Sequence, residues 1–177
     1  MAEYNNFQTN KPHRIGYALS GGFIKGFAHL GVMQALLEHD IKPDIISGVS
    51  AGSLAGVFYA DGYEPYQAVE KFNGYKFMDL TSWALTINGF FKLDDFKDFL
   101  NTNLKHKRLE DMEIPLVITA TDLDHGKSVQ FRKGNIAELV AASCCMPVMF
   151  APVNIDGINY VDGGVLKNLP VSTIRKE

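Results

Sequence analysis

Short apolar, β-branched runs alternate with segments of helical apolar spacing along the first half of the chain. Strands are predicted at residues 14–19 and 43–47, and helices at residues 23–37 and 53–59. A strand, a helix and a second strand in succession form a β-α-β unit, in which the two strands lie parallel with the helix across one face. The first half therefore predicts an α/β fold with a mainly parallel central sheet.

The second half adds amphipathic segments, another β-branched run and a hairpin signal. Asp156-Gly157 lies between alternating apolar residues, as the turn of a β-hairpin does. The elements predicted here are helices at residues 63–72, 94–104 and 135–145, a central strand at 114–120, an edge strand or hairpin arm at 128–132, and a hairpin across 153–162.

One aromatic stretch, residues 83–91, leaves two interpretations open. It is either a lid or lipid-facing loop, or a group of side chains packed beneath the next helix. The second role is the commoner one for scattered apolar residues.

Length and charge limit the class of protein. With 177 residues, 46% of them hydrophobic, the chain can bury one substantial core but hardly two. We expect a polar tail at residues 1–13 and a single domain at residues 14–177. The net charge of −3, without a basic block, argues against nucleic-acid binding. Transient contact with a membrane surface would have to be mainly apolar.

Targeting and redox signals favour a cytoplasmic protein. The polar N-terminus lacks the apolar core of a signal peptide, and the apolar residues 136–153 are interrupted by Glu138, Pro147 and Pro152. Cys144 and Cys145 are adjacent, so two buried thiols in a reducing compartment are expected rather than a disulfide. No metal-ligand spacing accompanies them.

Residues 48–52 (Gly-Val-Ser-Ala-Gly) join the second predicted strand to the second predicted helix. Ser50 therefore lies on a strand-to-helix turn, which lifts its hydroxyl above the edge of the sheet. Glycines flank it because side chains there would collide with the neighbouring strand and helix. This pattern predicts a nucleophile elbow.

A second glycine turn, Gly21-Gly22, follows the first predicted strand. Phe23 and the run Gly-Phe-Ala at residues 26–28 exclude a dinucleotide fingerprint and a phosphate-binding P-loop. In parallel strands the two turns bring two helix N-termini to one sheet edge. Two interpretations of Gly21-Gly22 follow. It is either a simple strand-to-helix connection or a loop whose N–H groups bind an oxyanion formed at Ser50, and the nearby elbow favours the oxyanion loop.

Asp162 is the best candidate for a partner of Ser50. It ends the second arm of the predicted hairpin, before two glycines that allow a sharp turn, whereas Asp156 already has a role in the hairpin turn. An isolated Asp-Gly-Gly would more often be a simple turn. His125 lies in a connection and is expected to be solvated.

These motifs, in this order and spacing, resemble the patatin-like phospholipases. The likeness covers nearly the whole chain. It is carried by residues 20–26 (Ser-Gly-Gly-Phe-Ile-Lys-Gly), 48–52, 162–164 (Asp-Gly-Gly), 27–32, 142–144 with Pro147, and 168–170.

The resemblance implies a three-layer α/β/α fold and hydrolysis of acyl lipids through a Ser-Asp dyad and an acyl-enzyme. By that resemblance Ser50 is the nucleophile, Asp162 the base, and the loop formed by Gly21, Gly22 and Phe23 the oxyanion hole. The expected substrate is a phospholipid or related acyl ester, and no cofactor or metal is required.

The chain departs from the family pattern in two places. Phe23 stands where a third glycine is usual; it keeps the N–H, but it is expected to lose access to positive φ and to add bulk beside the reacting carbonyl. Relatives usually continue beyond the Asp-Gly-Gly segment, whereas this chain stops at Glu177. A domain truncated at its C-terminal end is one interpretation.

Two other functions remain as alternatives. An α/β-hydrolase esterase would use a His-containing triad, but no histidine follows Asp162. A non-catalytic lipid-binding module would keep the apolar cleft without the chemistry. The sequence leaves open hydrolysis against transacylation, the head group and the oligomeric state.

Overall fold

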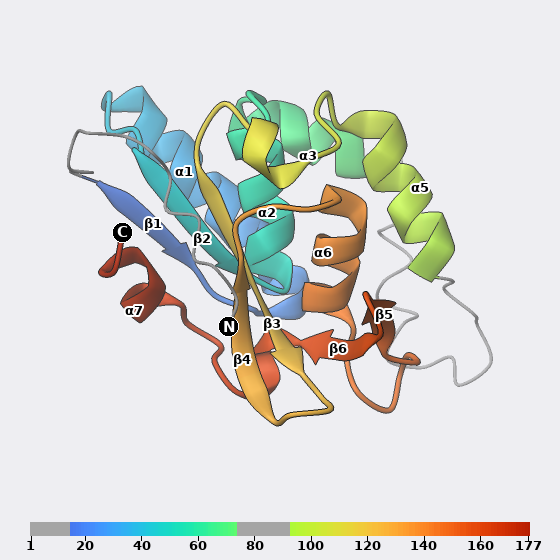
Figure 1. The fold of residues 1–177 in the computed structure, drawn as a ribbon. Helices are drawn as coiled ribbons and strands as arrows, with labels where there is room; N and C mark the ends of the chain where they lie inside the picture. Colours follow the sequence, from blue (N-terminus) through green and yellow to red (C-terminus); the bar gives the residue numbers. More distant parts are fainter. Residues whose placement is uncertain (1–14, 74–92) are drawn as a thin grey trace.

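The structure is a computed structural model that describes residues 15–73 and 93–177 (Figure 1). The predicted tail at residues 1–13 and the aromatic stretch at residues 83–91 lie outside the described residues. The helices are α1 (Gly26–Glu38), α2 (Ala51–Ala60), α3 (Pro65–Asn73), α5 (Leu93–Asn103), α6 (Ile136–Cys144) and α7 (Val171–Ile174), with 3-10 turns at Phe23–Lys25, Leu109–Asp111 and Gly163–Val165.

The parallel part of the sheet consists of β1 (Gly16–Leu19), β2 (Ile45–Val49) and β3 (Leu116–Asp122). Helix α1 connects β1 to β2, and α2 follows β2, as the apolar pattern predicted. The predicted α/β class and the β-α-β unit are confirmed. The predicted helix at residues 23–37 differs at its start, because a 3-10 turn precedes α1.

Three further strands join β3 antiparallel: β4 (Lys127–Phe131), β6 (Ile158–Asp162) and, through β6, β5 (Val153–Ile155). Strand β4 pairs with β3 from Ile118 to Asp122, so it occupies one edge of β3 over these residues. Strand β2 pairs with residues 116–119 of β3, and β6 pairs with residues 120–122. Since each residue has only two edges, β2 and β6 must share the other edge of β3, end to end.

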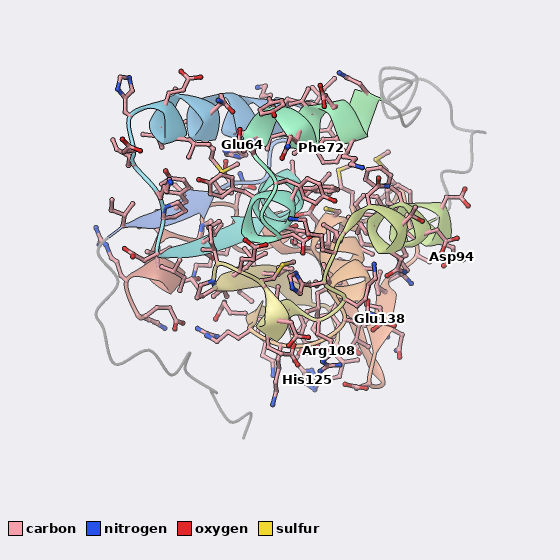
Figure 2. The ribbon with its side chains drawn as sticks, turned by 90° about the horizontal axis from the view of Figure 1, so that it is seen from above. Glu64, Phe72, Asp94, Arg108, His125 and Glu138 are labelled. Carbon is pink, nitrogen blue, oxygen red and sulfur yellow. The ribbon has the colours of Figure 1, made fainter. Side chains whose placement is uncertain are left out.

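The helices cover the two faces of the sheet unequally. Gly56 of α2 packs against Ile46 of β2 and Leu19 of β1, whereas Gly16 of β1 meets Ile174 of α7 on the opposite face. Beyond α2, the helices α1 and α3 lie side by side, as the view from above shows (Figure 2). The result is a three-layer arrangement in which one outer layer, among the described residues, holds only the short α7.

Aromatic rings unite the helices on the thicker side. Phe58 of α2, Phe72 of α3 and Phe99 of α5 have ring centroids 4.9 to 6.0 Å apart. Contacts in this range combine burial of apolar area with favourable ring geometry. The cluster fixes α5 over α2, and the two helices are elements of the pocket wall described below. Among the described ranges, no helix has the length and apolar character to cross a bilayer.

Candidate active site

Ser50 occupies a strained turn between β2 and α2. Its φ of +52° and ψ of −123° are rare for a residue with a side chain. A Cβ on Gly52 would lie 2.3 Å from the carbonyl oxygen of Leu19 in β1, and one on Gly48 would lie 2.5 Å from the backbone of Ser53 in α2. The flanking glycines therefore let the strand and the helix approach, as the sequence pattern indicated.

Sheet topology brings Asp162 to Ser50 across 112 positions of sequence. Strands β2 and β6 run toward each other along the same edge of β3, where Val49 pairs with Thr119 and Asp162 pairs with the next residue, Ala120. Both carboxyl ends therefore meet at one point. Ser50 Oγ donates a hydrogen bond of 2.6 Å to Asp162 Oδ2, a length typical of a hydroxyl bound to a carboxylate.

The Asp162 carboxylate is buried and oriented from both sides. Its second oxygen, Oδ1, accepts the N–H of Gly164 at 2.7 Å. Burial raises the pKa of Asp162 above its ordinary value, while the hydrogen bonds from Ser50 and Gly164 oppose that shift. No Lys, Arg or His of the described chain forms an ion pair with it. A carboxylate in these surroundings is a stronger base than one in water.

Ser143, at the end of α6, connects the two chain segments that meet here. Its buried Oγ accepts the backbone N–H of Ser50 at 2.8 Å and donates to the carbonyl of Thr119 at 2.7 Å. One hydroxyl thus satisfies the backbone at the junction where β2 and β6 both end. Ser143 lies in the run at residues 142–144 that carries the family resemblance, but no role was predicted for it, because the run does not indicate a contact 93 positions away.

The glycine loop lies directly against Ser50. A Cβ on Gly21 would be 3.2 Å from Ser50 Cβ. Asn168 clamps this loop: its carbonyl accepts the Gly21 N–H at 3.2 Å, and its Nδ2 approaches the Gly21 carbonyl at 3.4 Å. The Gly21 N–H is therefore already paired, whereas the Gly22 N–H has no acceptor among the residues that the structure describes.

Phe23 takes up a left-handed backbone, with φ of +55°. The expectation that its side chain would lose access to positive φ was wrong. The fold holds this position at positive φ despite the Cβ, at a cost of about 1–2 kcal/mol. The ring lines the pocket beside Ser50, which agrees with the expected bulk near the reacting centre.

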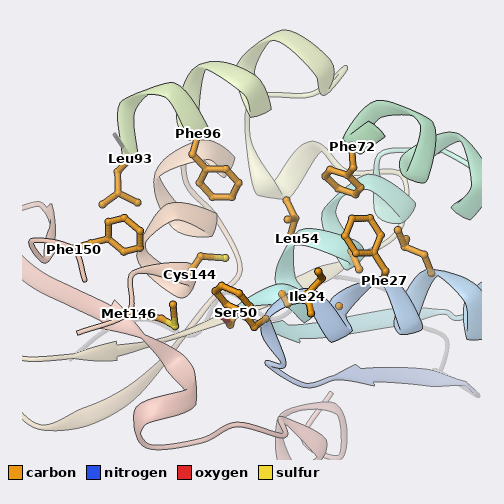
Figure 3. Close-up of a pocket in the computed structure, with 15 residues that line it drawn as sticks. Ile24, Phe27, Ser50, Leu54, Phe72, Leu93, Phe96, Cys144, Met146 and Phe150 are labelled. Carbon is orange, nitrogen blue, oxygen red and sulfur yellow. The ribbon is translucent and has the colours of Figure 1, made fainter. Parts of the chain in front are cut away.

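An apolar pocket opens beside Ser50 (Figure 3). No charged side chain lies in the described lining, and Ser50 supplies its hydroxyl. Figure 3 shows Phe96 and Leu93 above Ser50, with Phe27 and Phe72 to one side and Phe150 to the other. The lining suits an apolar ligand, since small-molecule sites are lined mainly by apolar and aromatic side chains.

The two adjacent cysteines are free thiols, as predicted, although Cys144 is only partly buried. Cys144 lines the pocket, where burial raises the pKa of its thiol far above the ordinary value. Burial also raises the pKa of Cys145 to about 11. Both thiols are therefore protonated at neutral pH, a form in which cysteine is a poor nucleophile. In the described ranges no three His, Cys, Asp or Glu side chains gather as metal ligands.

His125 pairs with a different aspartate. Its Nδ1 lies 2.9 Å from Asp122 Oδ2, and its backbone N–H donates to Asp122 Oδ1 at 3.0 Å. The side chain is exposed at the periphery of the molecule (Figure 2). Within the described chain it makes no hydrogen bond to Ser50 or Asp162.

Comparisons with known proteins point in one direction. The family model for Patatin-like phospholipase matches residues 17–174. An uncharacterized NTE family protein of Mycobacterium tuberculosis is 31% identical over 163 residues, which cover 91% of this chain and 45% of that protein. Lysophospholipase NTE1 of Saccharomyces cerevisiae is 30% identical over 169 residues, covering 91% of this chain and 10% of that protein. The chain thus spans less than half the length of these curated relatives.

A solved structure shares the fold. The crystal structure of VipD from Legionella pneumophila superposes with a TM-score of 0.69 over 90% of this chain and 47% of that one. Sequence identity is 18%, so this likeness concerns the fold alone.

Proposed function

The chain belongs to the patatin-like phospholipase family, and on that premise we propose that it is a serine hydrolase of acyl-lipid esters. Ser50 is the proposed nucleophile and Asp162 the general base. The observation that carries this proposal is the 2.6 Å hydrogen bond between Ser50 Oγ and Asp162 Oδ2 beside an apolar pocket. A cytoplasmic location and peripheral contact with membranes are part of the same proposal.

The proposed reaction begins with proton transfer from Ser50 Oγ to Asp162 Oδ2 as Oγ attacks the ester carbonyl. The tetrahedral intermediate collapses, the alcohol leaves with the proton from Asp162, and the acyl group remains on Ser50. Water then attacks the acyl-enzyme, giving up a proton to Asp162 as it does so. Release of the fatty acid restores the serine hydroxyl and the free carboxylate.

An aspartate such as Asp162 is intrinsically a weaker base than the histidine that most serine hydrolases use. The reference pKa of an aspartate lies about 2.6 units below that of imidazole, which corresponds to about 3.5 kcal/mol. Burial reduces the deficit by raising the pKa of Asp162. The absence of a basic partner in the described chain prevents the opposite shift.

The proposed oxyanion hole is the loop of Gly21, Gly22 and Phe23, with Gly22 and Phe23 as the donors. Gly21 positions the loop, since its N–H already pairs with Asn168. The N-terminus of α2, which begins directly after Ser50, adds favourable partial positive charge. His29 supports the same loop, because its Nε2 lies 2.9 Å from the Ser20 carbonyl.

The pocket supports an acyl chain as the group bound next to Ser50. Its described lining offers apolar side chains and no charge, so it suits a hydrocarbon chain better than a polar head group. Relatives named lysophospholipase agree with a lipid carrying one acyl chain. A short p-nitrophenyl ester and a lysophospholipid are therefore suitable test substrates.

Labelling with a fluorophosphonate tests the nucleophile directly. Wild type is expected to label and to hydrolyse p-nitrophenyl butyrate, whereas Ser50→Ala should do neither. Ser128→Ala, which removes a serine on β4, is the control and should behave as wild type. A folded wild-type protein that neither labels nor turns over ester would favour the lipid-binding module instead.

A further inference from the structure

Exposed apolar side chains surround the mouth of the pocket. They come from three separate segments: Phe23, Ile24, Val148, Met149 and Leu169, which we call the apolar collar. Val148 is fully exposed, and the other four are 38% to 54% exposed. Scattered exposed apolar residues are ordinary, but a group at one site indicates a binding surface.

The pocket itself shows that the first two segments of the collar meet. Phe23 and Ile24 belong to the pocket wall, and so do Met146 and Phe150, which flank Val148 and Met149 in sequence. The collar is therefore continuous with the apolar interior beside the nucleophile.

The third segment reaches the same mouth through the glycine loop. Leu169 follows Asn168, whose hydrogen bonds hold Gly21. Gly21 in turn packs against Ser50, so Leu169 is the next residue after one that contacts the loop beside Ser50. The third segment of the collar therefore adjoins the glycine loop that carries the first.

Val148 is held in an unusual backbone conformation. Its φ is +73°, in the left-handed region that β-branched residues rarely enter. The conformation leaves the side chain in solvent and buries nothing in the described structure. Strain of this kind, where the fold gains no packing from it, points to a role outside the isolated protein.

Charge distinguishes a lipid surface from other apolar partners. Residues 21–25, 146–150 and 163–169 contain Lys25 and Lys167 but no Asp or Glu, although the chain as a whole has a net charge of −3. Apolar side chains combined with lysines are typical of surfaces that bind anionic lipids.

We propose that the apolar collar docks into the surface of an anionic lipid bilayer, with the mouth of the pocket facing the lipid. An acyl chain then passes from the bilayer to the pocket without crossing water. The inference rests on the proposed function for what enters the pocket; the docking itself requires no chemistry.

The test is sedimentation with vesicles, performed with the full chain carrying Ser50→Ala so that no lipid is consumed. Phosphatidylcholine vesicles containing phosphatidylglycerol are compared with phosphatidylcholine alone. We expect stronger binding to the anionic vesicles, reduced by salt. Val148→Ser with Met149→Ser should weaken partitioning about tenfold or more, because two apolar side chains no longer enter the lipid.

Val32→Ser is the matched control, since Val32 is an exposed valine of α1 outside the pocket wall. It should leave partitioning unchanged. Leu169→Ser provides a second collar variant on a separate segment and should also weaken it. Equal partitioning of the collar and control variants, or no vesicle binding by the parent protein, would overturn the proposal.

Two further outcomes separate rival explanations. Wild type could elute as a dimer in gel filtration, and the collar variants as monomers. In that case a second copy of the chain covers the apolar collar, and lipid docking is refuted. With Ser50 intact, Val148→Ser with Met149→Ser should still hydrolyse p-nitrophenyl butyrate at the wild-type rate. If wild type lacks that turnover yet binds vesicles through the collar, the proposed function fails and the docking surface stands.

Discussion

The ladder between β3 and β6 has a buried carboxylate at each end. Asp162 of β6 pairs with Ala120, and Asp122 of β3 pairs with Tyr160, two positions along the same ladder. Each aspartate also accepts a backbone N–H from a residue shortly after it in sequence. In position and burial the two groups are closely matched, so their remaining contacts decide what each does.

Their partners differ in charge. Burial alone would raise the pKa of Asp122, but hydrogen bonds from His125 and electrostatic interactions with the basic side chains of His125 and Lys127 outweigh it and lower that pKa. Asp162 has a serine hydroxyl in place of a basic side chain, and burial raises its pKa. Basic partners therefore lower the pKa of one carboxylate, whereas burial raises the pKa of the other.

A third buried aspartate repeats the first pattern. Asp61, at the end of α2, accepts the N–H of Lys105 and of His106, and its Oδ1 lies 2.7 Å from His106 Nδ1. Of the aspartates buried in the described chain, only Asp162 lacks a basic partner. Burial without charge compensation thus distinguishes the candidate catalytic carboxylate from the structural ones.

Replacing each carboxylate by its amide gives the largest expected effect. Asp162→Asn should lower kcat/KM for p-nitrophenyl butyrate about a thousandfold or more, because the amide cannot accept the serine proton. Its Tm should equal or exceed that of wild type, since an uncompensated buried charge is removed. Activity assays and thermal unfolding measure both.

Asp122→Asn is the matched comparison and should behave in the opposite way. Its Tm should fall because His125 and Lys127 lose their partner, while turnover stays within about tenfold of wild type. A loss of turnover equal to that of Asp162→Asn would remove the distinction drawn between the two groups.

On the acid side of its pH profile, kcat/KM for ester hydrolysis should fall about tenfold for each unit by which the pH is lowered. Asp162 must be ionised to act as base, and its raised pKa places the acid limb of kcat/KM above 3.8, the ordinary aspartate value. An acid limb centred at or below that value would show that another group, or a carboxylate with a lowered pKa, controls the rate.

The contribution of Asp162 to the free energy of unfolding should fall as the pH rises, over the same pH interval in which kcat/KM increases. Because the folded state binds the Asp162 proton more tightly than the unfolded chain does, its contribution is most favourable below pH 3.8 and is lost as pH rises through the folded pKa. Asp162→Asn removes that dependence. For Asp122 the lowered pKa has the reverse effect, so its stabilisation is lost on acidification through the folded pKa.

A smaller effect is expected at the junction that holds Ser50 in place. Ser143→Ala leaves the Ser50 N–H and the Thr119 carbonyl without their buried partner, which costs about 1–3 kcal/mol of stability. Turnover should fall about tenfold through kcat, because the hydroxyl of Ser50 is less well positioned. Denaturant unfolding and steady-state kinetics measure the two effects.

Ser47→Ala is a control for the loss of a buried serine hydroxyl. Ser47 is fully buried in β2, yet its Oγ has no hydrogen-bond partner among the described residues. Its replacement should be neutral or stabilising. Equal losses of stability in the two variants would mean that the hydrogen bonds of Ser143 contribute nothing specific.

The smallest effect should come from His125→Ala. Turnover should remain within about twofold of wild type, because this histidine is exposed and paired with Asp122. A loss as large as that of Ser50→Ala would instead support a His-containing triad.

Much of the fold followed from local patterns. The β-branched runs predicted β1, β2 and β3, and the Asp156-Gly157 turn predicted the β5–β6 hairpin, because side-chain periodicity and turn chemistry act over a few residues. The same locality explains the elbow, where Gly48 and Gly52 marked a close approach of strand and helix. Element ends were less certain, as the later start of α1 shows.

The candidate site could be proposed from sequence only in part. Ser50, Asp162 and the loop at Gly21 were predicted as site residues. Ser143 and Asn168 lie in runs that carry the family resemblance, but no role was predicted for them, since each acts through a contact with distant backbone. Phe23 was misjudged for a related reason. Its positive φ is imposed by the surrounding fold against the preference of the residue itself.

The sequence by itself determined which elements form and which side chains carry reactive groups, because both depend on neighbours within a few positions. Only the tertiary structure decided that β2 and β6 end against each other on one edge of β3, and so which buried carboxylate meets a hydroxyl and which meets a cation. Strand pairing joins segments tens of residues apart in the chain, and it brings Ser50 to Asp162 across 112 positions. No local pattern encodes that choice, since it depends on how the whole chain buries its apolar surface.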